Sequence, residues 1–275
     1  MILQWMGGKF DLAPFIIKHM PQHNRYVEVF FGGGHVFWQK NLVKENIIND
    51  FNGNLINLYR VVADEIKYKL LIWRLENTIY SRELCDEYIK LYYDKNFVFL
   101  PKLERAFIYL YLNKTTFNGE FGCYIARESG TALYNVTPKV EAVHKKLRQG
   151  NTVIEHLHFR DVIEKFDGID TLFYLDPPYW ITTTQMGNHY YEQLMKREEH
   201  EELIDILSNT KGKWLLSYDD VPIIREVYSE FNIIETPKMH QSSSNTNVGG
   251  EGKGLYKSEL LITNFDTNQS NNLFA

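Results

Sequence analysis

Short hydrophobic runs and amphipathic patterns alternate near both ends of the 275-residue chain. Runs of this length between turn residues are typical of buried strands, and we place them at 25–30, 46–48, 152–157, 171–175, 214–217, 231–235 and 258–263. Hydrophobic residues at helical spacing predict helices at 35–41, 197–208 and 221–228. Strands that alternate with helices in this way predict an α/β fold.

The middle of the chain breaks this alternation. Leu58, Val62 and Ile66 repeat at helical spacing, and Leu103, Phe107 and Leu110 do so further on. A polar loop follows at 113–119. We therefore expect an inserted, mostly helical subdomain at 59–150, between two parts of an α/β domain at 1–58 and 151–275, with its polar loop facing a partner.

The composition favours a soluble protein. With 44% hydrophobic and 15% aromatic residues, the chain can bury a full α/β core. It has no stretch of about 20 apolar residues and no basic segment leading into an apolar one at its start, so we expect a cytoplasmic protein without membrane contact. Cys85 and Cys123 are isolated, which predicts neither a disulfide nor a metal site.

The net charge of −5 is unevenly distributed. Between Lys95 and Gly150 there are nine basic residues and four acidic ones, so this segment carries +5 and the remainder −10. Such a separation of charge would let one face meet phosphates. An ordinary solvated helical surface explains the same charges equally well.

The strand at 171–175 ends in Asp176-Pro177-Pro178-Tyr179. Ligands of open α/β sheets bind at the carboxyl ends of strands, so this tetrapeptide is a candidate site. The exocyclic amine of adenine is a poor nucleophile, and two acceptors, Asp176 and the Pro177 carbonyl, would help to localise its lone pair. Pro178 fixes the turn, and Tyr179 offers a ring to a base taken out of the stack. A strand followed by an Asp-Pro turn also occurs without such a role.

Two further motifs suggest a cofactor that contains adenosine. Phe31-Gly32-Gly33-Gly34 joins a strand to a helix, as in nucleotide-binding domains, although its spacing is not Gly-x-Gly-x-x-Gly. Asn49-Asp50 ends the next strand, about twenty residues beyond Glu28, where an acid commonly takes ribose hydroxyls. In Trp5-Met6-Gly7-Gly8-Lys9 the glycines permit close approach, so Lys9 could reach a carboxylate and Trp5 could cover a ligand.

Taken in order, these motifs and the 113–119 loop resemble the Dam-type (D12-class) DNA adenine-N6 methyltransferases over nearly the whole chain. The resemblance implies an S-adenosylmethionine-dependent methyltransferase (Rossmann-like) sheet at 1–58 and 151–275, with a target-recognition subdomain at 59–150. Val29 stands where the family often has proline. The segment 120–138 does not match the residues with which Dam-type enzymes read GATC, so no particular recognition sequence is implied.

The resemblance also implies roles for individual residues. Lys9 would hold the methionine carboxylate, Phe30 the adenine face and Asp50 the ribose. The segment Phe159-Arg160-Asp161 is expected to close the strand at 152–157 with an acid, and the resemblance places this Asp161 near the adenine. The full cofactor set is Trp5, Lys9, Glu28, Phe30, Gly32, Gly34, Asp50, Asp161 and Asp176. The catalytic set is Asp176, Pro177, Pro178 and Tyr179, and the DNA-binding set is Asn113, Lys114, Phe117, Asn118 and Gly119.

The expected activity is site-specific methyl transfer from S-adenosylmethionine to N6 of a flipped adenine in double-stranded DNA, without a metal, by a monomer or weak dimer. Two alternatives stay open. The substrate could be an adenine in RNA, or the chain could be a non-catalytic nucleic-acid-binding relative that keeps the cofactor pocket. The intact tetrapeptide at 176–179 argues against the second alternative.

Overall fold

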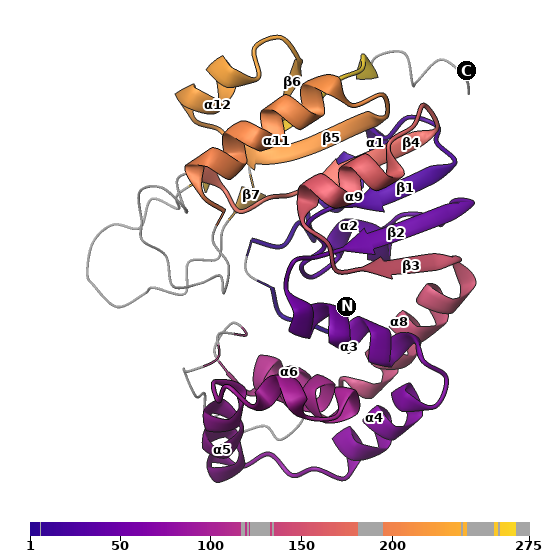
Figure 1. The fold of residues 1–275 in the computed structure, drawn as a ribbon, viewed down its shortest axis with the longest axis vertical. Coiled ribbons are helices and arrows are strands. Elements are labelled where there is room, and N and C mark those ends of the chain that lie inside the picture. The colour runs from indigo at the N-terminus through magenta and orange to yellow at the C-terminus, as the bar shows by residue number, and fades with distance from the viewer. Residues whose placement is uncertain are drawn as a thin grey trace.

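Seven strands form one sheet in the order β3-β2-β1-β4-β5-β9-β6 (Figure 1). The computed structural model describes residues 1–5, 7–116, 119, 121, 133, 135–180, 195–237, 239–240, 256–257 and 259–267. The strands of the sheet are β1 (Arg25–Glu28), β2 (Glu45–Asn49), β3 (Thr152–Glu155), β4 (Thr171–Leu175), β5 (Lys213–Asp219), β6 (Asn232–Glu235) and β9 (Glu259–Thr263). A separate pair consists of β7 (Met239–His240) and β8 (Tyr256–Lys257).

Strand direction determines which residues meet at the functional edge. β3, β2, β1, β4 and β5 are parallel, whereas β9 is antiparallel to both of its neighbours, β5 and β6. The carboxyl ends of these five strands, and that of β6, which runs in the same direction, therefore share an edge with the first residue of β9. The strand order reverses between β1 and β4, which is where open α/β sheets bind ligands. The predicted α/β fold class is therefore confirmed.

Helices cover both faces of the sheet and form a separate group below it in Figure 1. Their bounds are α1 (Ala13–Lys18), α2 (His35–Gln39), α3 (Gly53–Ala63), α4 (Lys67–Glu76), α5 (Arg82–Tyr92), η1 (Phe97–Phe99), α6 (Lys102–Thr115), α8 (Thr137–Gln149), α9 (Phe159–Phe166), α11 (Arg197–Asn209) and α12 (Pro222–Val227). Within the described ranges, no helix combines the length and the apolar character needed to cross a membrane.

Alternation along the strands divides the core into two hydrophobic clusters. Successive side chains of a strand point to opposite faces, so Tyr26 belongs to one cluster and Val27 to the other. The cluster with Val27 contains Val162 of α9 and Leu203 of α11, the two helices that lie in front of the sheet in Figure 1. The cluster with Tyr26 contains side chains from α1, α2 and α3.

The helices of the predicted insert share a core with the sheet. Leu58 of α3, Leu71 of α4 and Phe107 of α6 belong to the same buried cluster as Tyr26. Helix α3 begins after Asn52, whose side chain accepts hydrogen bonds from the amides of Asn54 and Leu55 at 3.0 Å, and it continues through residue 59 without a break. The expected boundary between 58 and 59 therefore falls inside a helix, and the division into domains stays a prediction.

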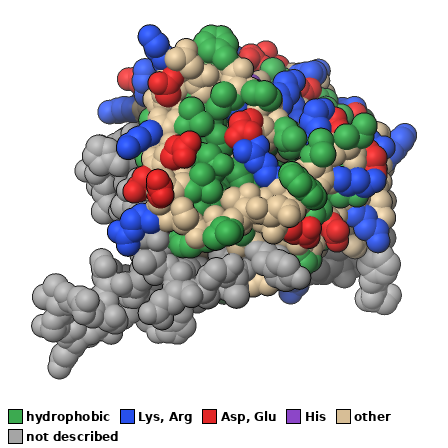
Figure 2. All heavy atoms as spheres, turned by 90° about the horizontal axis from the view of Figure 1, so that it is seen from below, with side chains coloured by type: hydrophobic (Ala, Val, Ile, Leu, Met, Phe, Trp, Pro, Cys, Tyr) green, Lys and Arg blue, Asp and Glu red, His purple; other side chains and the backbone are tan. Residues whose placement is uncertain are grey.

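The charge of the insert is less concentrated than its sequence suggests. Lys146 of the +5 segment donates hydrogen bonds to the carbonyls of Trp38 at 3.0 Å and Lys40 at 2.7 Å, so this charge is half-buried inside the fold. Glu104 forms an ion pair with Arg74. Figure 2 shows basic, acidic and hydrophobic side chains mixed on the face seen from below. That face carries no continuous basic surface over the part of the chain that the structure describes.

Candidate active site

The glycine turn after β1 requires glycine at two positions. Gly32 and Gly34 have φ of 47° and 66°, a left-handed conformation that other residues rarely adopt. A Cβ atom at Gly32 would lie 2.5 Å from Nε1 of Trp5, so this segment also packs directly under the Trp5 ring. The Gly32 amide donates to Oδ2 of Asp50 at 2.8 Å, which ties the turn to the end of β2.

The N-terminal segment lies against this turn and is anchored from a distance. A Cβ atom at Gly8 would lie 1.6 Å from Cε1 of His35, the first residue of α2, so only glycine allows the contact. The Gln4 amide donates to Oδ1 of Asn113 at 2.8 Å, and Nδ2 of Asn113 donates to the Gln4 carbonyl at 2.8 Å. Asn113 thereby connects the last turns of α6 to the segment that carries Trp5 and Lys9.

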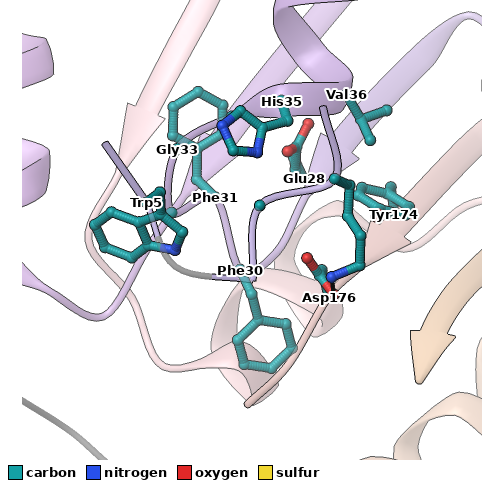
Figure 3. A pocket seen from close by; sticks show the side chains of 13 residues that line it. Trp5, Glu28, Phe30, Phe31, Gly33, His35, Val36, Tyr174 and Asp176 are labelled. Atoms are coloured by element: carbon teal, nitrogen blue, oxygen red, sulfur yellow. Dashed lines mark ion pairs between the residues drawn. The ribbon is translucent and has the colours of Figure 1, made fainter. Parts of the chain in front are cut away.

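A hollow opens at the switch point between β1 and β4. Figure 3 shows Trp5 and Asp176 on opposite sides of this hollow, with the Phe30 ring beside the space between them. Seven of the nine residues predicted to bind a cofactor line it, namely Trp5, Lys9, Glu28, Phe30, Gly32, Gly34 and Asp176. Sequence motifs that lie up to 171 positions apart thus meet in one place.

The other two predicted cofactor residues are placed differently. Asp50 lies behind the glycine turn, where its oxygens accept hydrogen bonds from the amides of Gly32 and Asn52, both at 2.8 Å. Burial raises the pKa of Asp50. Asp161 was expected to end a strand, which is wrong, because β3 ends at Glu155 and Asp161 is exposed in the first turn of α9. It does not line the hollow.

Asp176 immediately follows β4 and pairs with Lys9. Nζ of Lys9 lies 2.9 Å from Oδ1 of Asp176 and donates a hydrogen bond to the Gly7 carbonyl at 2.7 Å. Lys9 is 6% exposed, so this is a largely buried ammonium group. Burial raises the pKa of Asp176 to about 6, with Lys9 opposing the shift and Glu259 adding to it. Asp176 is therefore mostly ionised at neutral pH and close to its titration point.

Glu28, at the end of β1, has a different charge state from Asp176. It is 2% exposed, and the hydroxyl of Tyr26 donates to its Oε2 at 2.8 Å. Burial raises the pKa of Glu28 to about 8, and the nearby charge of Asp176 adds to the shift. Glu28 is thus predominantly neutral at pH 7, and Asp176 carries the negative charge of this wall.

Tyr179 is supported from behind by buried aromatic side chains. Its ring stacks on Tyr218 of β5 with centroids 5.6 Å apart and planes 19° apart, and the Tyr218 hydroxyl hydrogen-bonds to Nδ1 of His200. Trp180 packs against the His200 ring at 5.3 Å. His200 is 3% exposed and belongs to this buried aromatic support.

Glu259 is a residue of this site that the sequence did not indicate. It is the first residue of β9, and its Oε2 lies 3.9 Å from Nζ of Lys9. A single acid at the start of a predicted strand carries no local signal, and only the antiparallel direction of β9 brings it to the edge where Asp176 lies.

The residues predicted to bind DNA are separated by the structure. Asn113 is 2% exposed and both ends of its amide bond to Gln4, so the structure gives it a contact inside the fold, and its contact with DNA stays a prediction. Lys114 is half-buried in the last turn of α6. Gly119 has φ of 79°, and a Cβ atom there would lie 2.5 Å from Nδ2 of Asn113. Phe117 and Asn118 lie outside the described residues.

The doubly wound sheet with its reversed strand β9, and the acid and aromatic ring after β4, define the methyltransferase fold class. Residues 5–241 match the family model of the D12 class N6 adenine-specific DNA methyltransferases. The chain therefore belongs to this family, as its motifs predicted.

Curated relatives agree with this assignment. The chain is 28% identical to the DNA N-6-adenine-methyltransferase of Escherichia phage P1, over 95% of this chain and 35% of that protein. It is 28% identical to the Type II methyltransferase M1.LlaDCHI of Lactococcus lactis subsp. cremoris, over 95% and 94% of the two chains. It is 24% identical to the DNA adenine methylase of Escherichia coli, over 94% and 93%. The chain thus spans about a third of the phage protein and nearly all of the other two.

Proposed function

We propose that this protein transfers a methyl group from S-adenosylmethionine to N6 of an adenine that is taken out of the stack of double-stranded DNA. The observation that carries the proposal is the position of Asp176, which adjoins the open hollow bounded by Trp5, Phe30 and the glycine turn. The names of the relatives, DNA adenine methylases among them, support DNA as the substrate.

The residues around the hollow fit S-adenosylmethionine. Trp5 and Phe30 offer rings to a purine, and Lys9 offers a buried ammonium to a carboxylate. The glycine turn brings backbone close to the ligand, since a Cβ atom at Gly32 would enter the space of Trp5. When bound, S-adenosylmethionine would supply a methyl group on a positively charged sulfur, and that sulfur would be the leaving group when the amine nitrogen of adenine takes the methyl group.

Asp176 and the Pro177 carbonyl act as the acceptors for the amine. Lys9 already meets Oδ1 of Asp176, so Oδ2 is the oxygen that receives one amine hydrogen, and the Pro177 carbonyl receives the other. Two acceptors pull the lone pair of N6 out of conjugation and aim it at the methyl carbon. The extra proton that N6 carries after it takes the methyl group would pass to the ionised Asp176 or to water.

Tyr179 provides the surface on which the flipped base lies. Because Tyr218 stacks against the opposite side of Tyr179, the ring is held in place before the base arrives. Extrusion of a base costs a few kcal/mol, and stacking on a preset ring offsets part of this cost. We assign DNA contacts to the last turn of α6 and the residues that follow it, where Lys114 and Gly119 lie.

The decisive experiment supplies S-adenosylmethionine with a labelled methyl group to the protein together with duplex DNA, single-stranded DNA or RNA of one sequence. Nucleoside analysis should find N6-methyl-2′-deoxyadenosine in duplex DNA. Asp176→Asn is the matched control, since it keeps the shape of the side chain and removes its charge. Label in RNA alone would identify an RNA adenine methyltransferase. Cofactor binding without transfer to any substrate would identify a non-catalytic relative.

A further inference from the structure

The first residue of β9 lies beside the catalytic carboxylate because of strand direction. β9 is antiparallel to β5, with Glu259 paired in register with Asp219, the last residue of β5. The start of β9 therefore lies at the edge where the parallel strands end. Asp176 follows β4, the neighbour of β5, so both carboxylates lie at the same edge of the sheet.

One ammonium group is shared between these two carboxylates. Nζ of Lys9 lies 2.9 Å from Oδ1 of Asp176 and 3.9 Å from Oε2 of Glu259. The three side chains are 6%, 20% and 22% exposed in the order Lys9, Asp176 and Glu259, so water screens them incompletely. Nζ also lies 4.8 Å from the centre of the Tyr179 ring. The lysine is thus held between two acids and beside the ring that is to receive the base.

We propose that Glu259 is a positioning residue for methyl transfer, which shares the Lys9 ammonium with Asp176 and so preserves Asp176 as an acceptor for the adenine amine. The proposal rests on the proposed function of this site. Without the Glu259 charge, Lys9 would pair more closely with Asp176. A carboxylate neutralised in this way attracts an amine hydrogen less strongly.

Few of the titratable groups around Asp176 are charged near pH 7, so the effect of the Glu259 charge on Asp176 can be separated from that of its other neighbours. The titratable groups that face Asp176 are Lys9 from the N-terminal segment, Glu28 of β1, Tyr174 of β4, Tyr179 and Glu259. Burial keeps Glu28 predominantly neutral near pH 7 and raises the pKa of both tyrosines well above their usual value. Within the described residues, Lys9 and Glu259 are therefore the charged neighbours in this set, and they act in opposite directions on the pKa of Asp176.

The test compares wild type with Glu259→Gln in the full chain, using kcat for duplex DNA as a function of pH. Removal of the negative charge should move the acidic limb of the profile to lower pH and should lower the plateau by roughly two- to fivefold. Glu155→Gln is the matched control. Glu155 ends β3 at the far side of the sheet and pairs with Lys165 at 2.6 Å, so the change of charge is the same and the site is left intact.

A second measurement keeps the inference separate from the activity. Carboxyl ¹³C titration of the free protein, with the Asp176 signal assigned from Asp176→Asn, should give a lower Asp176 pKa in Glu259→Gln and an unchanged one in Glu155→Gln. Glu259→Asp, which keeps the charge, should stay near wild type and serves as the charged comparison if Glu259→Gln folds poorly. An unmoved Asp176 titration together with an unmoved limb in a folded Glu259→Gln would overturn the inference while leaving the proposed function intact. Wild-type protein that methylates no nucleic acid would overturn both.

Discussion

Replacement of Asn113 tests whether this residue holds the fold together or contacts DNA. Its amide makes two hydrogen bonds of 2.8 Å with the backbone of Gln4, and the side chain is 2% exposed. Asn113→Ala leaves the part-buried N–H and carbonyl of Gln4 without their partner. Each such loss costs about 1–3 kcal/mol, and partial access of water to the gap reduces the sum. We expect the free energy of unfolding to fall by about 2–4 kcal/mol.

Urea denaturation of wild type and Asn113→Ala measures this difference, with the midpoint shifted and the slope unchanged. Because Gln4 directly precedes the segment with Trp5 and Lys9, S-adenosylmethionine affinity should fall more than DNA affinity. Asn113→Asp keeps the acceptor for the Gln4 amide, but when ionised it cannot donate to the Gln4 carbonyl. The carboxyl pKa should therefore be raised in the folded state, so that the stability of this variant falls as pH rises through it. A loss of DNA affinity with stability unchanged to within about 0.5 kcal/mol would refute the reasoning.

Three further predictions concern the site and the DNA contact. Methyl transfer by the wild type should fall as the pH drops through about 6, because protonated Asp176 no longer accepts an amine hydrogen, and a flat kcat profile there would contradict its role. Tyr218→Ala should slow transfer by removing the ring behind Tyr179, whereas Tyr218→Phe should be milder since it keeps the stack; equal losses in single-turnover assays would locate the effect in the hydroxyl instead. Lys114→Ala should weaken binding to all duplexes and reduce the slope of log affinity against log salt by about one, and an unchanged slope would place the phosphate contacts elsewhere.

Local patterns were sufficient to predict the sheet and most of the hollow. Hydrophobic runs predicted every strand of the seven-stranded sheet to within a few residues, because five of the strands are largely buried and the two edge strands, β3 and β6, are still partly buried. The glycine turn and Asp176 directly follow parallel strands, so their arrival at one edge follows from the α/β fold itself. No knowledge of contacts with distant parts of the chain is needed to place these residues at that edge.

The sequence is a poor guide where a strand end or a long-range contact is not visible in the local pattern of residues. Asp161 was taken as an acid at a strand end, but the run at 152–157 stops at Glu155 and a helix begins at Phe159. Acids are favoured in the first turn of a helix, which accounts for Asp161 without any ligand. The DNA contact that the resemblance implies for Asn113 stays a prediction, but its bonds to Gln4 span 109 positions, and no local signal reports such a contact.

Glu259 shows most clearly what separates a motif from a site. A residue that ends a parallel strand reaches the ligand edge whatever the rest of the sheet does, so Asp176 could be assigned from its surroundings in the sequence alone. A residue that begins a strand reaches the same edge only if that strand runs antiparallel, and the direction of β9 depends on its insertion between β5 and β6. In the proposed function, the charge that acts on Asp176 from Glu259 therefore comes from the topology of the sheet, and the motif at 176–179 does not show it.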